Sequence, residues 1–106
     1  SGEAAERTKM LETCQDALRL GDGRKCADSA KQLLDRYPED DDARDLHTTG
    51  ESMEKMIAAL LSRAERLVTA GDRAAAKETI ECLLRVAPAH AKAKKLPVLA
   101  PLTKAI

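Results

Sequence analysis

Apolar residues recur at intervals of three and four along most of the chain, which is the spacing that places them on one face of an α-helix. Two such stripes lie on either side of Gly21-Asp22, and the second stripe ends at Pro38. Glycine favours the left-handed C-terminal cap of a helix, aspartate caps the start of the next helix, and proline ends it. We therefore expect a helical hairpin over about residues 3–37.

The same plan returns 50 residues further along the chain without a gap. Gly71-Asp72 repeats the turn, Pro88 repeats the stop, and apolar positions keep their register between the two copies. Single matches arise by chance, whereas a common register for turn and apolar residues indicates an internal repeat. We expect a second-unit helix over about residues 73–87 and a short helix over about residues 90–96.

The stretch between the two copies predicts one long shared helix. From Ala43 to Leu67, small and apolar residues alternate in steps of three and four without losing phase. An opposing signal lies at residues 48–51, where Gly50 offers a helix stop and a threonine and a glutamate form a capping box. We favour a continuous helix over about residues 40–70, because a true break would keep this phase only by accident. A bend near Gly50 would satisfy both signals.

Composition favours a small all-helical domain. The chain has 106 residues, of which 43% are hydrophobic and 1% aromatic, so aliphatic side chains and alanine have to build its core. The 18 basic and 18 acidic residues cancel, which argues against the basic face of a dedicated nucleic-acid binder. No apolar run approaches the roughly 20 residues of a membrane-spanning helix. We expect one domain over residues 1–96, with no nucleic-acid partner and no membrane insertion.

No group of residues has the spacing of a catalytic, metal or cofactor site. The sequence contains no glycine-rich phosphate loop, no nucleophile elbow and no C-x-x-C motif. His47 and His90 do not lie at ligand spacing from a cysteine, and we expect each to be a surface or capping residue. We therefore expect a protein that is not an enzyme and that has no catalytic residue, metal or cofactor.

The half of each copy that follows the Gly-Asp turn resembles a tetratricopeptide repeat (TPR). In that family a small residue follows the turn at a fixed offset, here Cys26 and Ala76, and the hairpin ends in proline. The resemblance covers about residues 7–40 and 57–97. It implies an all-α fold of TPR-like helical hairpins, with two repeat units joined by the long shared helix.

The chain departs from the family in its period and in its number of copies. The period is 50 residues, whereas about 34 is usual for the family. Two copies are also fewer than the roughly three that bury a continuous core. We expect the long helix, the segment at residues 90–96, dimerisation or flanking repeats to supply the remaining contacts.

The resemblance also implies a concave ligand groove along the first helix of each hairpin. The implied groove residues are Leu11, Gln15, Leu18, Arg19, Leu61, Glu65 and Val68. Leu11 and Gln15 replace two residues of the Lys and Asn pattern with which chaperone-binding members hold a C-terminal carboxylate. An apolar groove with Arg19 and Glu65 at its rim instead suits a peptide or an amphipathic helix. In the alternative interpretation, the same apolar side chains pack within the domain itself.

Two cysteines, Cys14 and Cys26, occupy the small positions where the family's paired helices approach most closely. The second copy has Ala64 and Ala76 at these positions, so a compact apolar side chain is the simplest requirement there. The other hypothesis is a redox pair that forms a reversible disulfide across the first hairpin, which needs Cα atoms within about 7 Å.

These observations predict a protein–protein interaction module, a scaffold or adaptor, within a larger protein. Ser1-Gly2 is typical of residues left after tag removal, so we expect the chain to be a fragment. Three cysteines without the density of a disulfide scaffold favour a reducing, cytoplasmic setting. The Ala-, Arg- and Asp-rich composition favours a bacterial source. The proline-interrupted apolar tail, residues 97–106, either covers its own repeat, binds a neighbour or leads into another domain.

Self-association is the alternative function. One candidate interface is the apolar stripe of the long helix, formed by Leu46, Met53, Ile57 and Leu60. The other is a head-to-tail contact between an acidic segment at residues 39–42 and a basic segment at residues 92–95.

Overall fold

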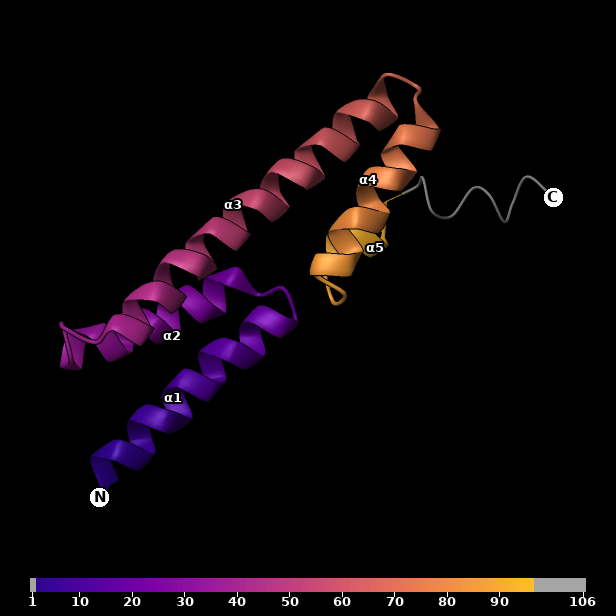
Figure 1. The fold of residues 1–106 in the computed structure, drawn as a ribbon. Helices are drawn as coiled ribbons and strands as arrows, with labels where there is room; N and C mark the ends of the chain where they lie inside the picture. Colours follow the sequence, from indigo (N-terminus) through magenta and orange to yellow (C-terminus); the bar gives the residue numbers. More distant parts are fainter. Residues whose placement is uncertain (1, 97–106) are drawn as a thin grey trace. The chain divides into compact units, whose positions relative to one another are not determined.

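The computed structural model describes residues 2–96 and consists of α-helices (Figure 1). The helices are α1 (Gly2–Arg19), α2 (Gly23–Arg36), α3 (Asp41–Thr69), α4 (Arg73–Val86) and α5 (Ala91–Lys94). No strand occurs within the described residues, which confirms the predicted all-α class. The predicted apolar tail, residues 97–106, lies outside the described part of the chain.

The chain divides into two compact units, Ser1–Lys55 and Met56–Ile106. The first unit contains α1, α2 and the N-terminal part of α3, and α1 and α2 lie side by side as a helical hairpin (Figure 1). The second unit contains the C-terminal part of α3 together with α4 and α5, and α5 contacts α4.

Both Gly-Asp turns have the geometry that the sequence predicts. Gly21 and Gly71 have φ angles of 79° and 84°, a region that residues with a side chain rarely adopt. Asp22 and Asp72 then cap α2 and α4, because each carboxylate accepts a hydrogen bond from the backbone N–H three residues later, at 3.0 and 3.1 Å. The predicted caps are confirmed.

The C-terminal ends of α2 and α4 also have nearly identical backbones. The C-cap residues Tyr37 and Ala87 have φ, ψ angles of −132°, 78° and −131°, 75°. Three residues after each C-cap, the side chains of Asp40 and His90 accept a hydrogen bond from a backbone N–H, at 3.1 and 3.2 Å. The turn and cap geometry of the first unit therefore recurs 50 residues later, and the capping role expected of His90 is confirmed.

The long helix α3 runs without interruption through Gly50, so the capping-box signal at residues 48–51 does not end it. The short helix α5 stops earlier than expected, at Lys94 rather than near residue 96. Its end has a local cause, because the residue before a proline is disfavoured in the α conformation and Leu96 precedes Pro97.

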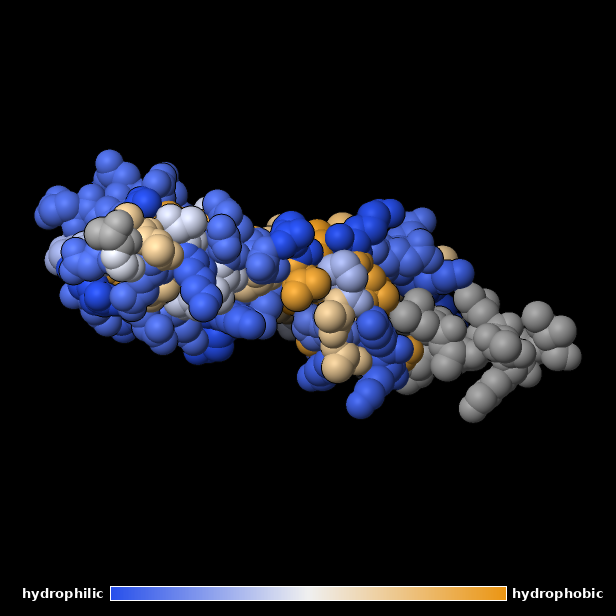
Figure 2. Space-filling model, turned by 90° about the horizontal axis from the view of Figure 1, so that it is seen from below, coloured by the Kyte–Doolittle hydropathy of each residue, from blue (hydrophilic) through white to orange (hydrophobic). Residues whose placement is uncertain are grey.

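The core of each unit combines alanines and other small residues with a few large aliphatic side chains, of which Leu33, Ile80 and Leu83 are fully buried. In the first unit Cys14, Ala17, Cys26 and Ala30 form one buried cluster, against which Leu18 and Leu46 pack. The buried residues of the second unit are Ala64, Ala76, Thr79, Ile80, Leu83, Ala87 and Ala93, together with Ile57. Small residues allow helix backbones to approach closely, but they bury little apolar area. Hydrophilic side chains cover most of the first unit's surface that Figure 2 shows.

Candidate partner-binding site

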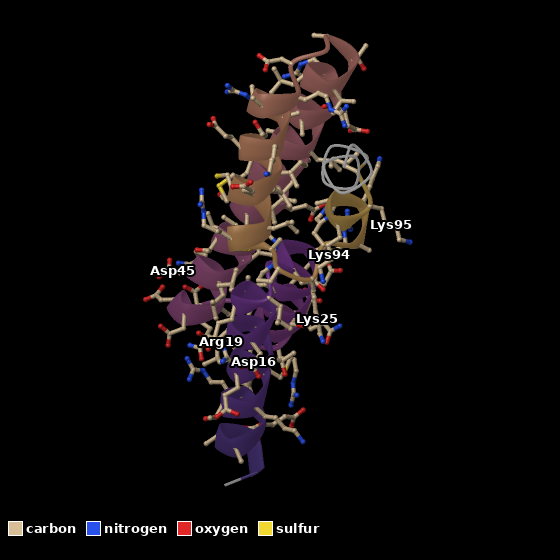
Figure 3. The ribbon with its side chains drawn as sticks, turned by 90° about the vertical axis from the view of Figure 1, so that its right-hand side faces the viewer. Asp16, Arg19, Lys25, Asp45, Lys94 and Lys95 are labelled. Atoms are coloured by element: carbon tan, nitrogen blue, oxygen red, sulfur yellow. The ribbon has the colours of Figure 1, made fainter. Side chains whose placement is uncertain are left out.

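Four of the predicted groove residues lie on α1 in the first unit. Leu11 and Leu18 are half-buried, whereas Gln15 is exposed. Arg19 is also exposed and forms an ion pair with Asp16, one turn earlier on the same helix (Figure 3). Both residues of this pair are largely in water, so the pair adds little to stability and leaves Arg19 available to a partner. The face therefore consists of two half-buried leucines, seven residues apart, with polar groups beside them.

The other three predicted residues lie on the C-terminal part of α3 in the second unit. Leu61 and Val68 are half-buried and again seven residues apart. Glu65 is exposed between them, and its Oε2 lies 3.7 Å from Nζ of Lys92 on α5. Each unit thus carries a short apolar strip flanked by charge.

The hollows on the second unit involve few of the predicted residues. An open depression is lined by Glu65 together with other residues of the same helix and the following turn: Ser62, Arg66, Thr69 and Ala70. Another, formed by α3 and α4, is lined by Leu60, Arg63, Glu78, Thr79 and Cys82. Of the predicted groove residues, only Glu65 lines either hollow.

The structure brings the proposed redox pair together. Cys14 on α1 and Cys26 on α2 are both 0% exposed and belong to one buried cluster. The Sγ of Cys26 also donates a hydrogen bond to the carbonyl of Leu46, at 3.3 Å. All three cysteines are free thiols, and Cys82 is half-buried on α4.

Burial governs the protonation of these two thiols. It raises the pKa of Cys14, and burial together with the neighbouring Cys14 raises the pKa of Cys26 to about 11. Since the thiolate is the nucleophile and the metal ligand, burial of both residues disfavours their reactive form and hides them from reagents while the hairpin is closed.

The first unit also contains a charge cluster that the sequence did not indicate. Nε of Arg7 lies 2.5 Å from Oδ2 of Asp40, and a second nitrogen of Arg7 lies 3.0 Å from Oδ2 of Asp42. The hydrogen bonds from Arg7 hold the pKa of Asp40 below its usual value, against the opposing effect of burial. Asp41 pairs with Arg44 at 3.0 Å. Three acids of the predicted acidic segment therefore already have cations within the unit.

A close helix contact is the second feature missed from the sequence. Gly23 on α2 and Gly50 on α3 are both buried and face each other. A Cβ added to Gly50 would lie 2.7 Å from the carbonyl oxygen of Gly23 and 2.8 Å from the backbone nitrogen of Ala27. A glycine inside a helix costs about 1 kcal/mol relative to alanine and usually has a packing reason, which is the signal that could have identified this contact.

Within residues 2–96, no group of three or more His, Cys, Asp and Glu side chains could hold a metal ion. No helix in this part combines the length and the apolar character that a membrane crossing requires. Comparison of the chain with known protein families, characterised proteins and solved structures gave no match.

Proposed function

We propose that the chain is a non-catalytic protein–protein interaction module, built of TPR-like hairpins, that binds a peptide or an amphipathic helix. One observation carries the proposal. On α1 and on the C-terminal part of α3, Cys14 and Ala64 are fully buried, while apolar residues flanking them stay half-buried beside exposed polar groups. Each helix therefore has apolar area that the described residues of its own unit do not cover.

The spacing of this area suits a helical partner. Leu11 and Leu18 are two helical turns apart, as are Leu61 and Val68. An amphipathic helix laid along either strip would place its own apolar residues, spaced by three, four and seven, against these side chains. Since apolar burial contributes roughly 25 cal/mol per Å², completing the burial of such a pair would add about 1–2 kcal/mol to binding.

The recurrence of backbone geometry supports the TPR-like part of the proposal. Residues 50 positions apart share the left-handed glycine, the aspartate cap and the extended C-cap. The family's small positions, at Cys14 and Cys26 and at Ala64 and Ala76, are all 0% exposed. Small residues at these places let the paired helices pack at short range.

The proposal is tested with amphipathic-helix peptides selected for binding to the intact chain. Leu11→Ser should weaken the affinity of a peptide held by the first unit about tenfold, a loss of about 1.4 kcal/mol. The matched control is Leu20→Ser, because Leu20 is 59% exposed on the same stretch of chain and lies outside the predicted face. For a peptide held by the second unit, Leu61→Ser is compared with Met56→Ser, which alters a residue that is 44% exposed. Equal losses in variant and control would contradict the proposal.

Self-assembly is the alternative, and the packing within the chain weighs against its long-helix form. Leu46 packs on the first core cluster, and Met53 lies beside Gly23, so both contribute to the first unit itself. Ile57 is buried in the second unit. Packing also weighs against the contact between charged ends. Lys94 and Lys95 are exposed at the C-terminal end of α5 (Figure 3), but the acids at residues 40–42 already pair with cations within the first unit.

Light scattering in reducing buffer at low and high salt separates these functions. A monomer at both salt concentrations supports the binding module. A dimer at both concentrations would favour assembly through the long helix, and a complex that high salt dissociates would favour the charged ends.

A further inference from the structure

We propose that Cys14 and Cys26 are a buried dithiol that a peroxide oxidises to a disulfide, and that this bond fastens α1 to α2 in the first unit. The inference is independent of the partner-binding proposal, because it rests on the interior of the hairpin and not on its exposed face.

The position of the pair in the hairpin carries the proposal. The two thiols come from the two helices of one hairpin, 12 positions apart in the sequence, and both are 0% exposed in one cluster. The Sγ of Cys26 donates a hydrogen bond to the carbonyl of Leu46, which packs against the same cluster. A disulfide needs Cα atoms within about 7 Å of each other. Both cysteines come from paired helices and share one buried cluster, which places them as candidates for that bond.

The second unit has the same packing at these two positions but no thiol groups. Ala64 and Ala76 occupy the equivalent positions and are also 0% exposed. Compact packing at this place therefore needs only methyl groups. The first unit has sulfur at both positions, and a pair of sulfur atoms allows a covalent link that a pair of alanines does not.

The oxidation is balanced with a peroxide as the oxidant. With hydrogen peroxide as the oxidant, one thiol attacks a peroxide oxygen, the O–O bond breaks, and a sulfenic acid and one water are formed. The second thiol then attacks the sulfenic sulfur, an S–S bond forms, and the hydroxyl leaves as a second water. Two thiols lose two electrons and two protons in total, and the peroxide takes up both.

Burial of the two thiols determines when a peroxide can oxidise them. Both thiols are 0% exposed, and burial also raises their pKa values, so attack on a peroxide requires that α1 and α2 separate locally. Oxidation then follows the opening of the hairpin, and the product prevents further opening. A disulfide that closes the α1–α2 loop restricts the unfolded chain and raises the stability of the unit.

The experiment uses the full chain with Cys82→Ser, which removes the competing half-buried thiol. Dilute reduced protein is treated with hydrogen peroxide, quenched with acid, denatured and alkylated, and then analysed by intact mass and peptide mapping. The expected product has lost two hydrogen atoms and carries a bond between Cys14 and Cys26. Its thermal midpoint should rise by about 5 °C or more, and a reducing agent should reverse the rise.

The matched control is the triple variant Cys14→Ala, Cys26→Ala and Cys82→Ser, which copies the alanine pair of the second unit. It should fold with the same circular dichroism spectrum and show no peroxide-dependent midpoint shift. Free or overoxidised Cys14 and Cys26 in folded protein, a link between two chains, or a disulfide that leaves the midpoint unchanged or lowers it would each overturn the proposal.

Discussion

The first and second units have the same turns and caps 50 residues apart. They differ in whether another helix can pack against the backbone of the hairpin's second helix, α2 or α4. On α2, Gly23 has no side chain and Ala27 has only a methyl group, so Gly50 of α3 packs directly against the α2 backbone. On α4, Arg73 and Lys77 stand at the two corresponding positions. Long charged side chains do not permit a backbone-to-backbone contact, so the second unit cannot pack a further helix in the way that the first unit packs α3.

The two units also differ at the caps that follow α2 and α4 and at the small residues where their paired helices pack. Asp40 combines a cap with an ion pair to Arg7, whereas His90 provides a cap alone among the residues described. Cysteines stand in the first unit where alanines stand in the second. The residues that both units share form the turns and caps of the hairpin. The residues that differ between the units set the ion pairs, helix contacts and core side chains that stabilise each hairpin.

The largest expected effect comes from the close helix contact. Gly50→Ala should lower the free energy of unfolding of the first unit by about 3 kcal/mol, because the added methyl group meets backbone atoms that cannot move aside. Urea unfolding followed by circular dichroism measures the loss. Gly2→Ala is the control, since a Cβ there meets nothing within 4 Å. If both variants were equally stable, the glycine contact would not distinguish the two units.

The buried thiols predict a loss of stability at alkaline pH. The pKa of Cys26 is raised from 9.0 to about 11 in the folded chain, so its contribution is fully present below about pH 9 and is lost as the pH rises toward 11. Across this interval the unfolded state releases the proton first, and stability falls by up to about 1.4 kcal/mol per pH unit. Unfolding in urea with a reducing agent, at a series of pH values, measures the slope. The Cys14→Ala, Cys26→Ala variant should lack this part of the slope, and an identical slope would refute its assignment to the thiols.

Removing the carboxylate of Asp40, which caps α3, should lower the stability of the first unit somewhat less. Asp40→Ala should cost the first unit about 2 kcal/mol, because the N–H of Ala43 loses its acceptor and Arg7 loses one of its two carboxylate partners. Asp40→Asn, which keeps a cap acceptor but not the charge, should lie between this variant and the wild type.

The lowered pKa of Asp40 also gives this cap a pH dependence. Its contribution is present above the usual aspartate value of 3.8 and is lost as the pH falls through the lower folded value. Wild type and Asp40→Asn should therefore become more alike in stability under acid, as measured by thermal unfolding between neutral and acid pH. A difference that stays constant across that range would argue against the ion pair.

The smallest effect is expected at the corresponding cap of the second unit. His90→Ala should cost about 1 kcal/mol or less, since one hydrogen bond to the N–H of Ala93 is lost and no ion pair accompanies it. His47→Ala is the control, because His47 caps nothing and lies 3.3 Å from Glu51 on the same helix. Its cost should stay within about 0.5 kcal/mol. A loss at His90 as large as that at Asp40 would remove the difference between the two caps.

Features that depend on neighbouring residues were predictable from the sequence. The left-handed glycines, the aspartate caps and the helix-ending prolines act over a few positions, and the structure has the predicted turns and caps at Gly21-Asp22 and Gly71-Asp72. The continuity of α3 followed from the unbroken phase of its apolar residues, which outweighed the local stop signal at Gly50.

The candidate site was predictable only in part. The apolar spacing placed Leu11 and Leu18 on one face of a helix, but spacing alone does not state how much of each side chain the rest of the unit covers. Their half-buried state, and that of Leu61 and Val68, depends on which helices pack beside them. The predicted closeness of Cys14 and Cys26 came from the family resemblance, since the sequence by itself contains no signal for a pair across a turn.

By itself, then, the sequence determined the all-helical class, the turns with their caps and the 50-residue register, because short-range hydrogen bonds and backbone preferences set them. Only the tertiary structure decided that Gly50 is a contact between helices rather than a stop, and that Arg7 neutralises the acids at residues 40 and 42. The tertiary structure likewise decided that two thiols share one buried cluster. These features join residues 12 to 35 positions apart, and their energy comes from close packing and charge proximity that only the folded chain creates.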